Sequence, residues 1–364
     1  MRINNLLKVS ATCGIAALAL TACAANESTG GDEQGSGNLS GELIGSGASS
    51  QGSAQEAWIS GFQTQHEGVT VNYDPAGSGN GRETFQAGAS AFAGSDRAFK
   101  LEEISDGEFA ACKPGSAIVE FPAYISPIAV VFNLPGIDEL QLDAATVAKI
   151  FSGQITVWND PAIASQNLGV DLPDTTINPV HRSDKSGTTE NFTDYLTAAA
   201  PAEWTAGAVE EWPKELGGEA AQQTSGMISA VENGSGAIGY ADASRAGDLG
   251  KVKIKVGDNY IAYSPEAAAA VVDASQPEAD RKDSDLAITL DRTSNAEGVY
   301  PIVLVSYLIG CEEYQSADNA KLVKEYFGYV ASEEGQKQAA EAAGSAPLSA
   351  ELSEKIQGII AKIK

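Results

Sequence analysis

A short polar segment near the middle of the chain has the composition of an oxyanion-binding site. It joins a guanidinium to hydroxyl and glycine residues: Arg182, Ser186, Gly187 and Thr188. The residues after this segment carry apolar side chains at helical spacing, so Ser186 is expected at a helix N-terminus. The first backbone N–H groups of a helix lack partners within it and the helix dipole is positive there, which favours a bound phosphate or carboxylate. In the alternative interpretation, Ser186 only caps the helix, and Arg182 pairs with Asp184 on the surface.

Three earlier turns carry further candidates for the same site. Each turn follows a segment that is expected to form a strand, over residues 42–44, 69–73 and 91–96. A helix is expected after the first turn, and another is expected to begin at Arg82 after a glycine turn over 77–81. Ligands in open α/β sheets bind at the carboxyl ends of strands, so these turns should face one crevice. The candidate side chains in them are Ser49, Ser50, Ser78 and Asp96.

The rest of the chain supplies strands and helices that can carry these turns. Two continuous apolar runs, at 118–124 and 128–133, are of the kind that buried parallel strands have, with a crossing point between them. A helix capped by Asp143 is expected to end near Gly153, a late strand is expected over 300–307, and helices should follow to the C-terminus. We therefore predict an α/β fold.

The composition limits the kinds of partner that the chain can have. It has 364 residues with 43% hydrophobic side chains, enough for two domains with buried cores. Its 23 Lys and Arg against 49 Asp and Glu give a formal net charge of −26, which argues against a nucleic-acid partner and against a basic membrane-binding surface. The same charge opposes anions in general, so an anion site in this chain must depend on local donors and one or two arginines.

The N-terminus has the features of an export signal. Positive residues flank an apolar run over 14–20 that is too short to cross a bilayer. The run ends in Leu-Thr-Ala-Cys, which resembles a bacterial lipobox, so we expect residues 1–22 to be a lipoprotein signal peptide and Cys23 to be lipidated. An ordinary signal peptide is the alternative. Residues 23–40 are polar and glycine-rich, as in a flexible tether, and the protein is expected to be exported and lipid-anchored to the outer face of the cell membrane.

Two further cysteines lie beyond the N-terminal segment. Oxidation is favoured outside the cell, so we expect a disulfide between Cys112 and Cys311. A metal site is not expected, because the only histidines are His66 and His181.

The sequence does not carry a complete enzyme or cofactor-binding signature. Gly45-x-Gly47-x-x-Ser50 imitates a dinucleotide-binding fingerprint, but the third glycine is replaced. No P-loop motif and no G-x-S-x-G motif occurs, and neither histidine has a context that marks a general base. We therefore expect a protein that needs no cofactor and performs no catalysis.

Seven segments, taken in order, carry a likeness to a known family. They cover residues 45–49, 77–79, 94–96, 151–158, 182–188, 236–240 and 300–302. Together they resemble the PstS family, the phosphate-binding proteins of bacterial high-affinity phosphate ABC importers, over about residues 41–364. The resemblance implies a two-lobed periplasmic-binding-protein-like fold of type II, in which each lobe is a mixed sheet flanked by helices and the ligand lies in the cleft between them. One lobe would contain residues 41–124 and 304–364, and the other residues 125–303.

The resemblance also implies roles for single residues. The positions that match phosphate donors are Ser49, Ser78, Arg182, Ser186, Gly187 and Thr188. Ser50 stands where the family often has phenylalanine, which gives only its backbone N–H, and Asp184 matches an aspartate that holds the arginine. His181 and Lys185 are interpreted as residues at the rim. Asp96 matches a carboxylate that accepts a hydrogen bond from phosphate.

Asp96 would then explain selectivity between two anions of similar shape. Phosphate near neutral pH still carries a proton that Asp96 can accept, whereas sulfate carries none and would leave the carboxylate unpaired. In the alternative interpretation, Asp96 only neutralises the charge of Arg182. The two roles are compatible.

The function implied by the resemblance is that of a receptor rather than an enzyme. A monomer would bind inorganic phosphate and deliver it to the permease and ATPase subunits of an ABC importer. The alternative is an extracellular phosphate-ester hydrolase, which would need a nucleophile with a nearby base or a metal cluster.

Overall fold

The computed structural model describes residues 39–364. The predicted signal peptide over 1–22, the predicted lipidation site Cys23 and nearly all of the predicted tether lie outside these residues. In the described part of the chain, no helix combines the length and the apolar character that crossing a membrane requires.

One mixed sheet runs through the described residues. Its strands lie in the order β2-β1-β3-β13-β4-β8-β6-β7. In addition, β9 pairs with β4, and both β5 and β10 pair with β9. β1 runs parallel to β2 and β3, and β6 runs parallel to β7 and β8, whereas β13 and β4 are antiparallel to their neighbours. The strands are β1 (Ser40–Gly47), β2 (Gly68–Asp74), β3 (Phe92–Ser95), β4 (Ile118–Phe132), β5 (Glu139–Leu142), β6 (Asn178–Arg182), β7 (Glu219–Ala221), β8 (Ala237–Asp242), β9 (Gly250–Val256), β10 (Asn259–Ile261) and β13 (Val303–Cys311), with a separate pair β11 (Gln276–Pro277) and β12 (Ile288–Thr289).

The single strand β4 spans a region that the sequence predicts as two strands. It is buried along its whole length and pairs with β13 from Ile118 to Pro127 and with β8 from Ile128 to Phe132. The prediction of two parallel strands is wrong in both respects, since the strand is continuous and antiparallel to its neighbours. A strand that is buried on both faces has a continuous apolar sequence whether its neighbours run parallel or antiparallel to it. The sequence pattern therefore could not predict the direction of pairing.

The change of partner along β4 divides the described residues into two lobes. We refer to the part around β1, β2 and β3 as the first lobe and to the part around β6, β7 and β8 as the second lobe. For their residue boundaries we propose the ranges predicted above, 41–124 with 304–364 and 125–303. One segment of the second range contacts the first lobe, because the N–H of Glu120 donates to the Ser284 carbonyl oxygen at 2.9 Å.

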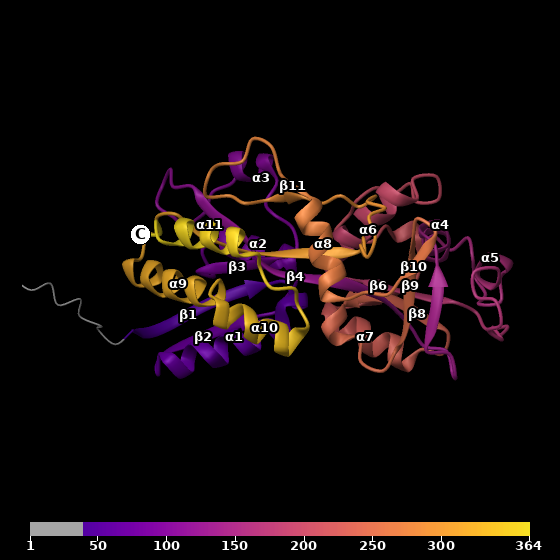
Figure 1. Cartoon of the computed structure of the whole chain (residues 1–364). Helices are drawn as coiled ribbons and strands as arrows, with labels where there is room; N and C mark the ends of the chain where they lie inside the picture. The colour runs from indigo at the N-terminus through magenta and orange to yellow at the C-terminus, as the bar shows by residue number, and fades with distance from the viewer. Residues whose placement is uncertain (1–38) are drawn as a thin grey trace, which may run out of the picture. The chain divides into compact units, whose positions relative to one another are not determined.

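Helices flank the sheet in both lobes, and the C-terminal helices return to the first lobe (Figure 1). The first lobe carries α1 (Gly52–Gln65), α2 (Ser78–Gln86), α3 (Leu101–Asp106), α9 (Ala317–Val330), α10 (Glu333–Ala343) and α11 (Ala350–Ile360). The second lobe carries α4 (Ala144–Phe151), α5 (Pro161–Ala164), α6 (Gly187–Ala199), α7 (Gln223–Asn233) and α8 (Pro265–Ala274). As predicted, Asp143 caps α4, since its side chain accepts a hydrogen bond from the N–H of Thr146 at 2.8 Å.

Helix α2 begins at Ser78, earlier than the predicted start at Arg82. Of the glycines that suggested a turn, Gly77 precedes the helix as its N-cap, whereas Gly79 and Gly81 lie inside the helix, where they allow close packing. A Cβ at Gly81 would lie 2.4 Å from the Cα of Gly47 in β1. The composition of this segment therefore reflects the close approach of helix and strand.

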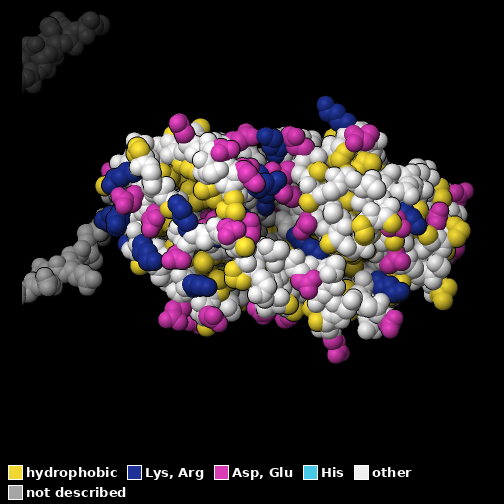
Figure 2. All heavy atoms as spheres, turned by 90° about the horizontal axis from the view of Figure 1, so that it is seen from above, with side chains coloured by type: hydrophobic (Ala, Val, Ile, Leu, Met, Phe, Trp, Pro, Cys, Tyr) yellow, Lys and Arg dark blue, Asp and Glu magenta, His cyan; other side chains and the backbone are white. Residues whose placement is uncertain are grey.

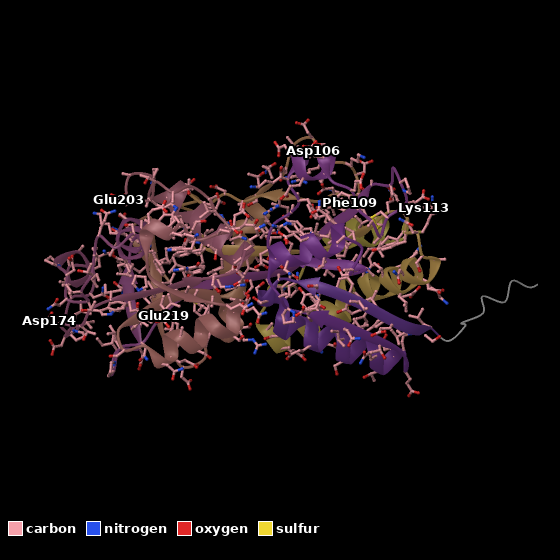
Figure 3. The ribbon with its side chains drawn as sticks, turned by 180° about the vertical axis from the view of Figure 1, so that it is seen from behind. Asp106, Phe109, Lys113, Asp174, Glu203 and Glu219 are labelled. Atoms are coloured by element: carbon pink, nitrogen blue, oxygen red, sulfur yellow. A yellow bond between two sulfur atoms is a disulfide. The ribbon has the colours of Figure 1, made fainter. Side chains whose placement is uncertain are left out.

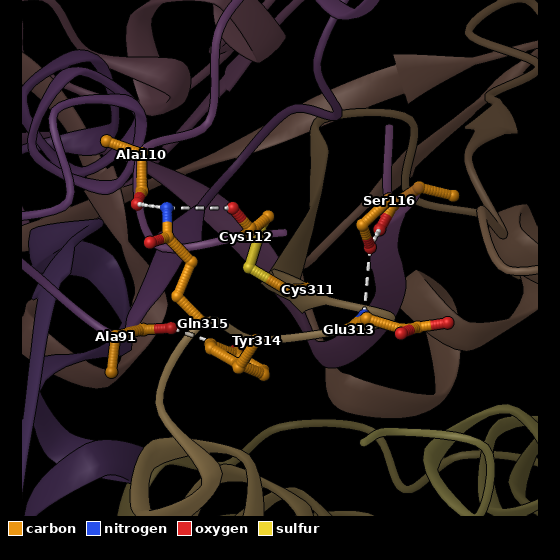
Figure 4. Close-up of a disulfide and its surroundings, with 9 residues drawn as sticks. Ala91, Ala110, Cys112, Ser116, Cys311, Glu313, Tyr314 and Gln315 are labelled. Atoms are coloured by element: carbon orange, nitrogen blue, oxygen red, sulfur yellow. Dashed lines mark hydrogen bonds between the residues drawn. A yellow bond between two sulfur atoms is a disulfide. The ribbon is translucent and has the colours of Figure 1, made fainter. Parts of the chain in front are cut away.

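Cys112 and Cys311 form the predicted disulfide within the first lobe, joining positions 199 residues apart. Cys311 is the last residue of β13, and Cys112 lies in the loop after α3. The Gln315 side-chain amide donates to the carbonyl oxygens of Ala110 and Cys112 at 2.9 and 3.2 Å (Figure 4). The disulfide and these hydrogen bonds fix the loop to the end of the sheet.

Candidate functional site

In the first lobe, three strand ends bring candidate residues together. Ser49 and Ser50 begin a short 3-10 helix just after β1. Ser78 is the first residue of α2, and Asp96 directly follows β3. Because β1 lies between β2 and β3 and all three strands are parallel, their carboxyl ends meet. These side chains are buried, and Asp96 is only 2% exposed.

The second lobe contributes a strand end and a helix start. Arg182 is the last residue of β6. Ser186 is the N-cap of α6, and its Oγ accepts a hydrogen bond from the N–H of Thr189 at 3.2 Å. Gly187 and Thr188 form the first turn of this helix, so the predicted helix N-terminus is confirmed.

Arg182 is held by Asp184 inside the protein. Its Nε donates to Asp184 Oδ1 at 2.8 Å and its Nη2 donates to Oδ2, while the residue is only 3% exposed. Burial alone would raise the pKa of Asp184, but the hydrogen bonds and charge of Arg182 outweigh burial and lower that pKa. Both contacts of the alternative interpretation are therefore present, but Arg182 is buried and the Asp184 side chain is only 14% exposed, so the pair does not lie on the surface. Of the five N–H groups of a guanidinium, Asp184 uses two, so three can face an anion.

The two lobes touch at Asp96. From the second lobe, Thr188 Oγ1 donates to Asp96 Oδ2 at 2.7 Å, and Asn191 Nδ2 donates to the Asp96 carbonyl oxygen at 2.6 Å. From the first lobe, Ser50 Oγ donates to Asp96 Oδ1 at 2.6 Å, and the Asp96 N–H donates to Ser78 Oγ at 3.1 Å. The carboxylate is thus the meeting point of hydroxyl groups from both lobes.

The alternative role of Asp96, as the counter-ion of Arg182, has no contact to support it. Within residues 39–364, Arg182 forms its ion pair with Asp184, and none joins it to Asp96. Asp184 therefore lies beside the guanidinium, whereas Asp96 lies among hydroxyl groups.

Two glycines allow the lobes to come this close. A Cβ at Gly187 would lie 2.8 Å from both the Cβ of Asp96 and the Oγ of Ser78. Gly77 has a φ of +105°, and a Cβ there would lie 2.5 Å from Asp184 Oδ2. A larger side chain at either position would hold the lobes apart.

Ser49 contacts a residue that the sequence did not indicate. Its Oγ lies 3.0 Å from Thr224 Oγ1 and accepts a hydrogen bond from the Thr224 N–H at 3.1 Å. Thr224 lies in the first turn of α7, and the preceding Gln223 N–H donates to Asp184 Oδ1 at 3.0 Å. The start of α7 therefore contacts Ser49 of the first lobe and the carboxylate that holds Arg182.

Sequence reasoning missed three polar residues of this site, namely Asn191, Thr224 and Ser306. Ser306 Oγ donates to Asp96 Oδ1 at 2.6 Å. A serine inside the buried apolar strand β13 was a signal that could have found it. For Asn191 and Thr224 the only signal was their position near a helix start, which many polar residues share.

Ion pairs between largely buried side chains join the two lobes. Glu210, in the loop after α6, accepts from Arg82 Nη2 at 2.6 and 2.8 Å and from Arg97 Nη2 at 3.0 Å. Arg97 Nε also lies 2.9 Å from Glu190 Oε2. Burial would raise the pKa of Glu210, but the two arginines outweigh burial and lower it. The Glu210 carbonyl oxygen accepts from the N–H of Ser186 at 3.1 Å, which ties these pairs to the N-cap of α6.

The side chains of the two residues expected at the rim contact other groups. Lys185 is exposed and pairs with Glu83 of the first lobe at 2.7 Å. His181 is half-buried and stacks on Trp212 with ring centroids 5.0 Å apart, and burial lowers its pKa. Across residues 39–364, no group of three or more His, Cys, Asp and Glu side chains is placed to hold a metal ion. The arrangement can therefore bind an oxyanion through hydrogen bonds and one guanidinium.

Comparison with known proteins shows which family the chain belongs to. Residues 32–334 match the family model described as a PBP superfamily domain. The chain is 33% identical over 321 residues to the phosphate-binding protein PstS2 of Mycobacterium bovis, covering 85% of this chain and 86% of that relative. The chain belongs to the PstS family. Another relative, the phosphate-binding protein PstS 3 of Mycobacterium leprae, is 33% identical to the chain over 288 residues. This match covers 78% of this chain and 77% of that relative.

Solved structures related to this PstS chain share its fold. A high affinity periplasmic phosphate-binding protein, PfluDING, bound with phosphate at pH 8.5, is 25% identical with a TM-score of 0.71, covering 87% of this chain and 93% of its own. The predicted two-lobed type II periplasmic-binding-protein fold is confirmed. The relatives are named as binding proteins, which agrees with the expectation that this chain is not an enzyme.

Proposed function

We propose that the chain captures inorganic phosphate in the crevice between its lobes. The observation that carries this proposal is the meeting at Asp96 of hydroxyl groups from both lobes, close to two helix starts and a buried arginine. A tetrahedral anion needs donors from several directions, and these elements approach from different sides. The proposed ligands are Ser49, Ser50, Ser78, Asp96, Arg182, Ser186, Gly187 and Thr188, with Asp184 as their support.

Asp96 selects phosphate over sulfate in this proposal. Its carboxylate accepts the proton that phosphate keeps near neutral pH. Sulfate has no such proton, so the same carboxylate would face it as an unpaired like charge in a site with little water.

Calorimetric titration of thoroughly phosphate-stripped protein tests the proposed function. We expect tight binding of phosphate, much weaker binding of sulfate, and no turnover of a phosphomonoester. Absence of phosphate binding would refute the proposal, and hydrolysis of the ester would favour the alternative of a phosphate-ester hydrolase.

The proposed role in the cell is that of an extracytoplasmic receptor. Cys23 would carry a lipid that anchors the chain to the outer face of the membrane, and the protein would deliver phosphate to the permease and ATPase subunits of an ABC importer. The lipobox-like segment supports the anchor, and the relatives' names support the ligand. Closure of the lobes would enclose the ion, remove it from water and create the shape that the permease recognises.

Glu210 is expected to slow the release of phosphate, because its ion pairs must break when the lobes separate. Replacing Glu210 with glutamine leaves the guanidinium groups of Arg82 and Arg97 buried without this carboxylate. We expect the dissociation rate of phosphate to rise by at least about tenfold, with a smaller change in the association rate. Stopped-flow measurement with a phosphate-scavenging chase gives this rate.

An exposed pair between the same lobes provides the control. Lys185 and Glu83 have side chains that are 47% and 60% exposed, so solvent and salt screen their attraction. Replacing Glu83 with glutamine should change the dissociation rate by less than about threefold. Equal effects of the two substitutions would contradict a specific role of the buried pair.

A further inference from the structure

A chain of buried hydrogen bonds leads from the helices of the first lobe to Asp96. Tyr326 of α9 donates to Gln55 Oε1 at 2.7 Å, and Gln55 Nε2 donates to Gln51 Oε1 at 2.8 Å. Gln51 Nε2 donates to Ser306 Oγ at 2.6 Å, and Ser306 Oγ donates to Asp96 Oδ1 at 2.6 Å. Each of these side chains is at most 2% exposed. Four donors therefore point in one direction and end on the carboxylate.

The direction of this chain is fixed by a backbone carbonyl. The same Gln51 nitrogen donates to the carbonyl oxygen of Tyr307 at 3.1 Å, and a carbonyl can only accept. The Gln51 NH₂ group must therefore face Ser306, and its two hydrogens are both in use. The single proton of the Ser306 hydroxyl is left for Asp96.

The local strand geometry places Ser306 at this position. Tyr307 pairs with Ser95 in the antiparallel pair of β13 and β3, so Ser306 lies beside Asp96 one step further on. The pairing of β13 with β4 changes register between Ser306 and Tyr307. Irregularities of this kind turn side chains toward a site.

Counting acceptor positions shows what the chain does to Asp96. A carboxylate has roughly four lone-pair positions. Ser50 and Ser306 fill the two on Oδ1, and Thr188 fills one on Oδ2. One position on Oδ2 is left, and only a ligand that brings a proton can use it.

We propose that Ser306 is a positioning residue that makes Asp96 an acceptor only, and so sets the preference for protonated oxyanions. This proposal rests on the proposed function and deepens it, since Ser306 acts on the anion through Asp96. The donation from Gln51 commits the Ser306 proton to Asp96, so donors fill both positions on Oδ1 and hold the carboxylate with its open Oδ2 position toward the ligand. Without this donor one position on Oδ1 is empty and the carboxylate can turn, so the ligand no longer meets a fixed acceptor.

The test compares phosphate and sulfate affinities of stripped full-chain protein by calorimetry. Replacing Ser306 with alanine should lower the ratio of phosphate affinity to sulfate affinity by about 10- to 100-fold, which is the size expected for losing a hydrogen bond to a charged group. Replacing Ser306 with cysteine should lower it similarly, because a thiol of similar size is a weak donor. Replacing it with threonine, which keeps the hydroxyl, should retain the wild-type ratio.

Ser126 provides a matched control. It is fully buried in β4, pairs with Leu304 of β13, and donates to the carbonyl of its own neighbour Pro127 at 3.3 Å. Replacing Ser126 with alanine should leave the ratio unchanged. An unchanged ratio in both the alanine and the cysteine variants of Ser306, or an equal loss of both affinities, overturns the role of Ser306. Failure of the wild-type protein to bind phosphate overturns the proposed function instead.

Discussion

Replacing Arg182 with alanine should weaken phosphate binding by about 30-fold to several thousand-fold. Two losses add in this variant. The anion loses a charge-assisted donor in a site with little water, and Asp184, whose side chain is only 14% exposed, is left without its partner. Arg182 is the main group that lowers the pKa of Asp184 in the intact protein, so the variant loses the partner that stabilises this carboxylate in its charged form. Equilibrium titration with phosphate measures the effect, and thermal melting checks that the variant is folded.

Two further variants separate geometry from charge. Replacing Arg182 with lysine keeps the charge but cannot form the paired contact with Asp184, so its affinity should fall between those of wild type and the alanine variant. The Arg245 side chain is 42% exposed, and its Nη2 lies 3.8 Å from Glu56 Oε1. Replacing Arg245 with alanine should therefore leave the affinity for phosphate nearly unchanged. An alanine variant of Arg182 that binds phosphate like the wild type would remove Arg182 from the site.

The negative charge of the protein does not prevent an anion site of this kind. Asp and Glu side chains are spread over both lobes of the face seen in Figure 2 rather than gathered in one band. Charges at the surface are screened by salt over roughly 8–10 Å, whereas the donors of the crevice are buried beside the position proposed for the ligand. Local geometry therefore outweighs the net charge of −26.

The sequence could predict most of the strand ends and helix starts that carry the proposed site, because such positions leave local signals. Small polar residues after β1 and β2, and the N-cap of α6, identify backbone turns by short-range chemistry. The disulfide could be predicted because two cysteines remain beyond the predicted export signal, in a compartment where oxidation is favoured. The single course of β4 could not be predicted, because partners far apart in sequence determine whether an apolar run continues and in which direction it pairs.

The contacts around Asp96 could not be predicted from the sequence for the same reason. Ser306 lies 210 residues from Asp96 in sequence, and Thr224 lies 175 residues from Ser49. Neither pair has a local pattern, since each arises from the register of β13 beside β3 or from the approach of the two lobes. The role of Ser50 also changed, because its side chain donates to Asp96 although the family resemblance implied only a backbone contribution.

Replacing Asp96 with asparagine should reduce the preference for phosphate over sulfate by at least about 100-fold. A site that hydrogen-bonds one group of its ligand discriminates against an analogue without that group by a factor of about 10⁴ to 10⁵. A loss of at least about 100-fold in the preference for phosphate is therefore within the range that this interaction can supply. The surrounding donors fix the orientation of the new amide. Ser50 and Ser306 both donate toward the Oδ1 position, so the asparagine oxygen belongs there. Its NH₂ group then faces Thr188 and the ligand.

An NH₂ group in that position donates to an anion, which reverses the chemistry of the site. Sulfate gains a hydrogen bond and loses a repelling charge, while phosphate loses the acceptor for its proton. Paired titrations with phosphate and sulfate at one pH give the ratio. Asp106 lies at the exposed end of α3, on the outer surface of the first lobe in Figure 3, and its replacement by asparagine should leave the ratio unchanged. If the Asp96 variant keeps the wild-type ratio, selectivity must arise elsewhere in the crevice, and the acceptor role assigned to Asp96 is wrong.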